Sequence, residues 1–327
     1  MHSNPPSRLC VLALLTLAVA FALFPYPTQP ASADAPYLLS LPLILRQASS
    51  HTTPTPIPPE QLALGRVNAY RALAGMRSLA LDPALVTAAQ RHADYDLLNV
   101  SDTSAWVLGP HGEVESKPGF SGTWPGDRAV AAGYAWAAGW EVISHFDDPE
   151  RAVDGLMATV FHRVNILTAT HAHLGYGHGQ TVIEAVDVLD FGRGGSEPGG
   201  APTVAFYPGP DQRDVPLYGA GETPSPLPPG ASYPIGYPIT LQPSGATALS
   251  VSAAELRDPS GVLVPLYPSP PDCVASCYAL LPIAGLRAGT TYTTHVVGTL
   301  NGVAFDSTWS FTTTACDNPL LCSGTKL

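Results

Sequence analysis

The sequence is poor in charged residues, and lysine is almost missing from it. Charged residues make up 13% of the 327 positions, about half of the ~25% that is usual in soluble domains. Lys117 and Lys326 are the two lysines, and the formal net charge is −11. A chain with this charge lacks the basic field that replaces counterions on a phosphate backbone. We therefore expect no nucleic acid among its partners.

Motifs for nucleophilic hydrolysis and for nucleotide binding are missing as well. Residues 60–192 contain no Gly-x-Ser-x-Gly elbow of the serine hydrolases. The glycines at 192–195 follow an expected strand but lead into a proline- and glycine-rich stretch at 196–200. A dinucleotide-binding loop requires a helix at that point. The sequence thus gives no support to either chemistry.

Proline and glycine, in contrast, are abundant, with 35 and 30 residues respectively. This abundance favours extended linkers and turn-rich β structure over a helical bundle, and it excludes a coiled coil. At ~150 residues per domain, the length favours two globular units over one.

Residues 1–33 have the pattern of a secretory signal peptide. Arg8 precedes an apolar run from Leu9 to Phe24, two prolines end the run, and Ala31-Ser32-Ala33 offers a cleavage site. The run is shorter than the ~20 residues that span a bilayer. We therefore expect cleavage, with an uncleaved anchor as the alternative, and no transmembrane segment afterwards. The protein should be secreted or otherwise extracytoplasmic, in a form that can associate with the cell surface.

Four cysteines remain after the expected leader, and export favours their oxidation to disulfides. Four cysteines allow three pairings, of which the simplest is two local bridges, Cys273–Cys277 and Cys316–Cys322. A metal site with four thiolates is the alternative. It is disfavoured because neither pair has the two-residue gap that is typical of zinc knuckles.

A Pro/Thr-rich linker at residues 34–59 precedes a region that mixes helices and strands. Apolar residues at helical spacing predict one helix from Glu60 and a second after Asp82-Pro83. A third helix is predicted after Asp148, and residues 129–143 fit a helix or a strand equally well. Strands are predicted at 172–177 and 181–191. This order indicates an α+β fold.

Several short motifs stand in a fixed order along this region: Val67–Arg71, Pro110–Gly112, Asp127-Arg128, Trp140–Ile143, His162–Leu167 and Leu174–Gly177. Together they resemble the CAP superfamily of cysteine-rich secretory, antigen 5 and pathogenesis-related 1 proteins, in its bacterial SCP-like extracellular form. The resemblance covers roughly residues 60–192. It implies an α-β-α sandwich with a central cleft, in which two histidines and nearby glutamates can hold a divalent cation.

Carried over residue by residue, the resemblance assigns His111, Glu141 and His162 to the cleft. Zn²⁺ or another divalent cation is the cofactor that this set implies. The sequence departs from the family pattern at several positions. Leu156 stands where animal members have a tryptophan, and Thr159 stands where they have a second glutamate. Trp140 and Val142 replace the glycine and asparagine that usually flank the position of Glu141. The expected ligand set is therefore incomplete, and we expect weak metal affinity.

The residues support the same chemistry without the family. Seven of the ten histidines lie within residues 60–192, and imidazole is a common ligand of zinc-like ions. Two imidazoles and a carboxylate leave room for a bound water, whose pKa the cation lowers toward ~7. Such a site could hydrolyse a bond, with Glu141 as the base, or only bind an ion.

Simpler interpretations compete with this site. His162 could interact with a helix end, His111 could be a solvated loop residue, and Glu141 could make a structural hydrogen bond. A rival metal cluster could form from His171 and His173 on one strand face, with His178 past a turn. His92 is best explained as a packed helix histidine.

After a Gly-rich linker at residues 193–201, the chain has all-β character from 202 to 314, followed by a C-terminal tail at 315–327. Short β-rich runs separated by proline and glycine turns predict a sandwich. The runs are 237–241, 249–256, 261–266, 277–281, 290–298 and 307–313. Motifs such as Val204–Pro208 and Trp309–Thr313 resemble bacterial Ig-like domains, which mostly space, stabilise or adhere.

These observations predict a secreted CAP-domain protein that serves as a binding module of the cell envelope or medium. Its cleft would take a protein, glycan or lipid ligand and could hold a divalent metal. Two alternatives stay open at this point: a metal-assisted hydrolase of peptides or envelope polymers, and a sterol- or lipid-binding protein. The sequence does not fix the ligand, the metal or the oligomeric state.

Overall fold

The structure is a computed structural model that describes residues 56–135, 139–193, 203–244, 248–273 and 277–316. The predicted signal peptide, most of the linker at 34–59, the linker residues 194–201 and the tail from 317 lie outside the described residues. By their contacts, residues 55–327 belong to one compact unit.

Two helices open the described chain at the predicted places. Helix α1 (Pro59–Leu73) and helix α2 (Pro83–Asn99) both begin with a proline, whose fixed φ suits the first turn. The side chain of Asp82 caps α2 by accepting hydrogen bonds from the amides of Ala84 and Leu85. One face of each helix is buried, as the apolar spacing predicted.

Three shorter helices follow: α3 (Pro125–Ala131), α4 (Pro149–Met157) and α5 (Phe161–Ile166), after a short 3-10 turn η1 (Thr103–Ala105). Asp148 caps α4 by accepting from the amide of Arg151. Residues 129–143 fitted a helix or a strand equally well in the sequence. Their first residues form the end of α3, and their last residues belong to strand β2 (Gly139–Ser144).

The first sheet has the strand order β1-β3-β4-β2, with β1 at Ala80–Leu81, β3 at His171–Gln180 and β4 at Ala185–Arg193. Strand β1 runs parallel to β3, while β4 pairs antiparallel with β3 and β2. Residues 181–184, which were predicted to belong to the strand, form the turn between β3 and β4 instead.

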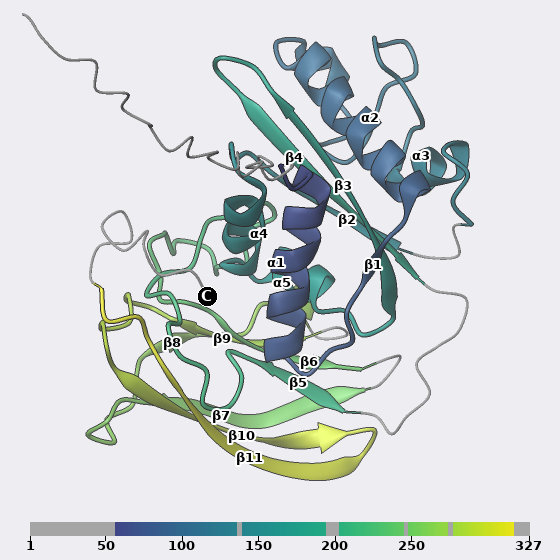
Figure 1. The fold of residues 1–327 in the computed structure, drawn as a ribbon. Coiled ribbons are helices and arrows are strands. Elements are labelled where there is room, and N and C mark those ends of the chain that lie inside the picture. Colours follow the sequence, from purple (N-terminus) through teal and green to yellow (C-terminus); the bar gives the residue numbers. More distant parts are fainter. Residues whose placement is uncertain (1–55, 136–138, 194–202, 245–247, 274–276, 317–327) are drawn as a thin grey trace, which may run out of the picture. The chain divides into compact units, whose positions relative to one another are not determined.

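Helices cover both faces of this sheet (Figure 1). Val186 and Val188 of β4 cluster with Ala89 and Ala93 of α2, whereas the alternate residues of β4 cluster with α1 and α4. Helix α2 lies so close to β3 that a Cβ added at Gly175 would clash with the backbone of Leu85. The layering is therefore helix, sheet, helix.

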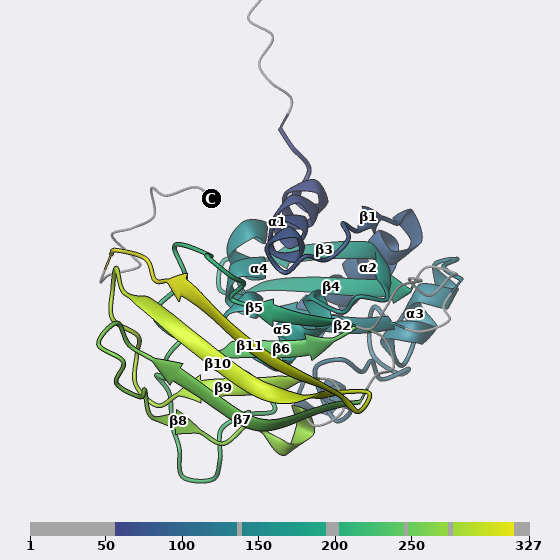
Figure 2. The ribbon, with the colours of Figure 1, turned by 90° about the horizontal axis from the view of Figure 1, so that it is seen from below.

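The remaining strands form two antiparallel sheets (Figure 2). One has the order β5-β6-β9-β8 and the other β11-β10-β7. Their bounds are β5 Val204–Tyr207, β6 Ile239–Pro243, β7 Leu249–Arg257, β8 Leu266–Tyr267, β9 Tyr278–Pro282, β10 Thr291–Leu300 and β11 Val303–Thr312. A short 3-10 turn η2 (Pro271–Cys273) precedes β9. Buried residues of both sheets share one apolar cluster. The all-β character is confirmed, while the Ig-like class stays a prediction.

One of the predicted strands is largely absent from the second region. The run 261–266 contributes only Leu266 to a strand, and Leu263 makes an isolated bridge to Arg257. Gly261 has a φ of +82°, which marks a tight turn in place of an extended start. The other predicted runs lie on strands with shifted ends.

A buried arginine ties the helical region to the β region. Arg163 of α5 is fully buried and donates to the carbonyls of Met157 and Pro238, and its guanidinium lies over the rings of Tyr207 and Tyr237. The division into domains at residues 193–201 stays a prediction, but the regions on its two sides share a core.

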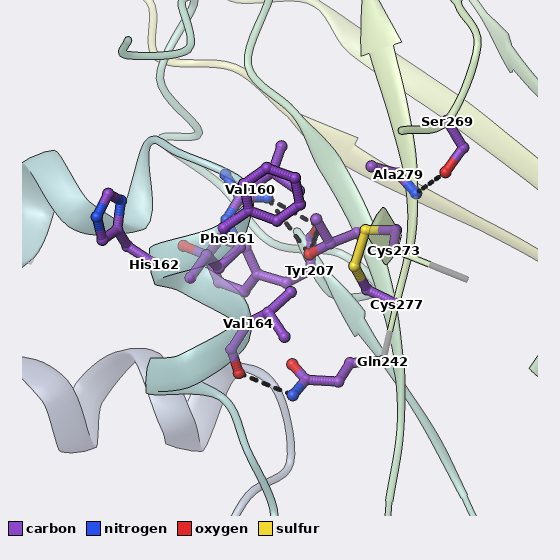
Figure 3. The surroundings of a disulfide bond; sticks show 12 residues. Val160, Phe161, His162, Val164, Tyr207, Gln242, Ser269, Cys273, Cys277 and Ala279 are labelled. Atoms are coloured by element: carbon purple, nitrogen blue, oxygen red, sulfur yellow. Dashed lines mark hydrogen bonds between the residues drawn. A yellow bond between two sulfur atoms is a disulfide. The ribbon is translucent and has the colours of Figure 1, made fainter. Parts of the chain in front are cut away.

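The predicted disulfide Cys273–Cys277 is present, and it belongs to an apolar cluster with Val164 of α5 and with Val160, the residue before α5. Figure 3 shows this bridge beside α5, with Gln242 donating to the carbonyl of Val164. Cys316 is also disulfide-bonded. Because Cys322 lies outside the described residues, the pairing Cys316–Cys322 stays a prediction.

Candidate functional site

A loop after α2 brings one predicted histidine to the predicted glutamate. His111 Nδ1 lies 2.8 Å from Glu141 Oε1, although the two residues are separated by 30 positions in sequence. The Glu141 side chain on β2 is 1% exposed, whereas the His111 side chain is 38% exposed. A buried carboxylate therefore holds a histidine ring that reaches the surface.

Arg128 of α3 fixes the other side of this pair. It is fully buried, donates to Glu141 Oε2 at 2.5 Å and donates to the carbonyl oxygen of His111 at 3.2 Å. Burial alone would raise the pKa of Glu141, but the charges of His92 and Arg128 and the hydrogen bond from His111 lower it to about 2. Glu141 is thus ionised, and both of its oxygens have a partner.

An ionised Glu141 also fixes the form of the His111 ring. The carboxylate can only accept, so Nδ1 carries the proton that it donates. The neutral ring then has Nε2 as an unprotonated acceptor. Since 38% of the side chain is exposed, this arrangement prepares Nε2 to accept a hydrogen bond or to coordinate an ion.

His92 of α2 belongs to the same network. Its ring is fully buried, with Nδ1 2.9 Å from Glu113 Oε1 and Nε2 3.0 Å from the carbonyl oxygen of Pro110. Both nitrogens face acceptors, which suits the doubly protonated ring. Burial lowers the pKa of His92, but the carboxylates of Glu141 and Glu113 outweigh it and raise the pKa overall. His92, which was predicted to be a packed helix histidine, therefore also pairs with a buried carboxylate.

Two aspartates complete the network under α2. Asp190 of β4 lies directly across from Glu141 of β2 and is fully buried. Among the described residues neither of its oxygens has a hydrogen-bond donor. Burial, followed by the charge of Glu141, raises its pKa well above the ordinary value. Once protonated, Asp190 can itself donate to the carboxylate of Glu141 across the sheet. On α2, burial raises the pKa of Asp96 to about 6.

His162, the third predicted residue, lies among other partners. Its Nδ1 is 3.1 Å from Glu222 Oε2 and 3.2 Å from Thr159 Oγ1. The carboxylate of Glu222 also accepts from the backbone amides of Val160 and Phe161 at the start of α5. Within the part of the chain that the structure describes, no hydrogen bond or ion pair links His162 to His111 or Glu141. The structure therefore joins His111 and Glu141 directly, while His162 is bonded to other partners.

The described residues contain no group of three or more His, Cys, Asp or Glu side chains that could hold a metal ion. The rival histidine cluster is not assembled either. His178 lies on β3 itself, not past a turn, and each of the three rings has its own neighbour. His171 stacks on Phe191, His173 meets the hydroxyl of Tyr134, and His178 meets Asp187.

Arg128 belongs to one of the motifs that indicated the family, but no motif singled out Glu113, Asp190 or Glu222 as site residues. Asp190 is the most instructive, because it alternates with apolar residues on β4 and so occupies a core position. A charged residue at an inward-facing strand position is the one local sign of a buried polar network. No local pattern of this kind marked Glu222. It lies in the β region, far along the chain from the helix start that it contacts.

Residues 64–181 match the model of the Cysteine-rich secretory protein family, CAP. This agrees with the resemblance that the sequence motifs indicated over residues 60–192. Neither the bacterial type nor the Ig-like region is part of this match, so both stay predictions. No curated protein matches the chain.

Two solved structures are similar to parts of the chain. An extracellular protein containing an SCP domain from Bacillus anthracis has 19% sequence identity and a TM-score of 0.34, over 43% of this chain and 45% of that chain. An outer surface protein from Borrelia burgdorferi has 16% identity and a TM-score of 0.33, over 41% of this chain and 90% of that chain. The similarity to the Bacillus protein thus spans less than half of that protein's length.

In the described ranges no helix combines the length and the apolar character that crossing a bilayer requires.

Proposed function

We propose that the protein is exported and acts as a binding module of the cell envelope or the surrounding medium, with His111 at its contact surface. One observation carries this proposal: a partly exposed histidine ring is held by a fully buried carboxylate, inside the region that matches the CAP family. The signal-peptide pattern of residues 1–33 supports export.

The cost of the network supports a role beyond folding. Glu141, Glu113, Arg128 and His92 are all removed from water. Removing charges from water costs several kcal/mol per ion, and apolar residues of similar volume often stabilise a core equally well. Despite this cost, the buried network holds the His111 ring at the surface in a fixed orientation. This arrangement favours a role of the ring in recognition.

The contacts of the ring favour binding over turnover. In the described residues no serine, threonine or cysteine side chain forms a hydrogen bond with His111, so the contacts of the ring give no evidence of an activated side-chain nucleophile. The ring can accept a hydrogen bond from a hydroxyl or amide of a ligand through Nε2. Once protonated, it can pair with an anionic group.

The family resemblance implies a divalent cation, and the donors present do not fit one in the expected way. Both oxygens of Glu141 are engaged by His111 and Arg128, and His162 is engaged by Glu222. No third ligand joins His111 among the described side chains. The role proposed for His111 therefore does not depend on a metal ion.

The test uses the protein from residue 34 onward with insoluble envelope polymers, an array of acidic glycans and lipid vesicles as separate baits. We expect one bait to retain the wild type and the His145→Ala variant, and to lose His111→Ala. His145 is the matched control because it is an exposed histidine of the same region. Circular dichroism shows whether each variant is folded.

Three results would contradict the proposal. Equal retention of His111→Ala would remove this ring from the binding surface, and retention by none of the baits would remove the binding role. Release of soluble fragments from a bait by the wild type, but not by His111→Ala, would make the protein an enzyme instead.

A further inference from the structure

A second site, separate from the His111 network, is formed where α1 and α4 face the segment from Gln212 to Tyr218. A cavity of about 530 Å³ lies there and shares no residue with that network. This volume is in the range of pockets that hold small ligands, which is ~300–1,000 Å³. We propose that this cavity binds a neutral oligosaccharide.

The polar side of the cavity is already in place before a ligand enters. Arg66 forms a two-point ion pair with Asp154, with Nε–Oδ1 at 2.5 Å and Nη2–Oδ2 at 2.9 Å. The hydroxyl of Tyr70 donates to Asp154 Oδ1, and the guanidinium of Arg66 lies over the Tyr70 ring. Because 39% of the Asp154 side chain is still exposed, it can accept from ligand hydroxyls without rearranging.

The apolar side of the cavity is formed by an anchored aromatic ring. Tyr218 is 44% exposed, and a Cβ added at Gly285 would clash with its ring, so the ring rests against the backbone there. Leu73 and Pro216 line the cavity beside it. An exposed ring with little freedom loses little entropy when a ligand packs on it. The C–H face of a sugar ring is a suitable partner.

The charges around the cavity favour a neutral ligand. Two arginines, Arg66 and Arg213, face two aspartates, Asp154 and Asp214, so the formal charges of the lining residues balance. A phosphate site would need an excess of positive charge, and a polyamine site would need an excess of negative charge. Alternating carboxylate, guanidinium and hydroxyl groups beside an aromatic ring instead match the hydroxyl groups of an uncharged sugar.

The backbone at the rim has an unusual conformation that is held in place. Asp214 has a φ of +55°, in the left-handed region that residues with a Cβ seldom adopt. The next residue, Val215, bridges to Thr313 and so fixes the rim to the last strand. Strained residues of this kind cluster at ligand sites. This observation is independent of the charge balance and points to the same cavity.

The test is calorimetric titration of the protein with three neutral trisaccharides, made of glucose, mannose and N-acetylglucosamine. We expect saturable binding of at least one of them, and a Kd at least about tenfold higher for Tyr218→Ala, which corresponds to about 1.4 kcal/mol. Ile283→Ala is the matched control, because it also removes an exposed apolar side chain, and its Kd should be unchanged. His111→Ala should bind the sugar as the wild type does, which separates this proposal from the previous one.

Failure of all three sugars to saturate would overturn the proposal. An unchanged Kd for a folded Tyr218→Ala would place the sugar elsewhere and overturn it as well. Titration with inorganic phosphate is the third arm, and displacement of the sugar by phosphate would show an anion site instead of a neutral one.

Discussion

Glu141 and Asp190 lie directly opposite each other on neighbouring strands, and both are buried. Their pKa values are shifted in opposite directions, downward for Glu141 and upward for Asp190. Glu141 keeps its charge because Arg128 and two histidines surround it. The pKa of Asp190 is raised because burial and the charge of Glu141 oppose its ionisation. The arginine favours the charged form of one carboxyl group, and that charge favours the protonated form of the other.

The substitution Asp190→Asn tests this assignment through pH. The raised pKa means that folded Asp190 holds a proton that the unfolded chain loses above the ordinary value of 3.8. The wild type therefore loses stability as the pH rises from that value through the folded pKa. The asparagine has no proton to lose, so its free energy of unfolding relative to wild type should increase as the pH rises above 3.8 toward the raised pKa of Asp190. Urea unfolding measures it, with exposed Asp94→Asn as control. A difference that does not change with pH would contradict the assignment.

Glu141→Gln should act in the opposite direction. Its lowered pKa means that Glu141 contributes stability above the ordinary value of 4.5, and that this stability is lost as the pH falls toward about 2. At neutral pH the variant removes the closest charge partner of the buried Arg128 and leaves Glu113, 3.6 Å from Nε, as the remaining one, so we expect a loss of about 3 kcal/mol in unfolding free energy. The difference from wild type should shrink in acid. Glu115→Gln, at an exposed position, should change little at either pH. Equal stability of Glu141→Gln and wild type at neutral pH would be the contrary result.

Zinc titration tests which predicted residues act together. Because His111 and His162 have separate partners, we expect the two rings to act independently. His111→Ala should lower the zinc affinity of the chelator-treated protein, and His162→Ala should leave that affinity unchanged. Calorimetry measures both. If both variants lose affinity equally, the two rings converge on one ion, contrary to the arrangement described. No zinc uptake by the wild type would show that the metal prediction is wrong.

Glu222→Ala tests the contact between the helical and β regions. The buried carboxylate accepts from the amides at the start of α5 and pairs with His162. Its removal leaves these donors unsatisfied, which costs about 1–3 kcal/mol for a buried group. We expect lower stability in urea and faster amide hydrogen exchange at Val160 and Phe161. Glu255→Ala is the control because its ion pair with Arg257 is partly exposed. Unchanged exchange at these amides would show that Glu222 does not hold the helix start.

The fold of the helical region was predictable where local chemistry acts alone. A capping aspartate followed by proline marked α2 and α4, and alternation marked β4. Residues 129–143 were ambiguous because an alanine-rich apolar run suits either a helix or a strand. Their outcome depends on pairing of β2 with β4, a contact between segments more than 40 residues apart. Local propensity carries no information about such a contact.

The candidate site was predictable only in part, for the same reason. His111 and Glu141 followed from motifs, and the structure joins them. The partner of His162 could not be foreseen, because Glu222 comes from the other region of the chain, 60 positions away. The family position for a second glutamate is occupied by Thr159, and a carboxylate from outside that region lies beside the same histidine.

The buried guanidinium of Arg163 has a consequence for truncated forms of this protein. Pro238, which accepts its hydrogen bond, and Tyr237 lie just before β6, and Tyr207 ends β5, so all three come from the chain beyond residue 203. A fragment that ends at residues 193–201 would expose the Arg163 guanidinium. It would also expose the apolar side chains that pack against the later strands. The C-terminal strands are therefore a fixed cover for the helices, and an excised N-terminal fragment should aggregate.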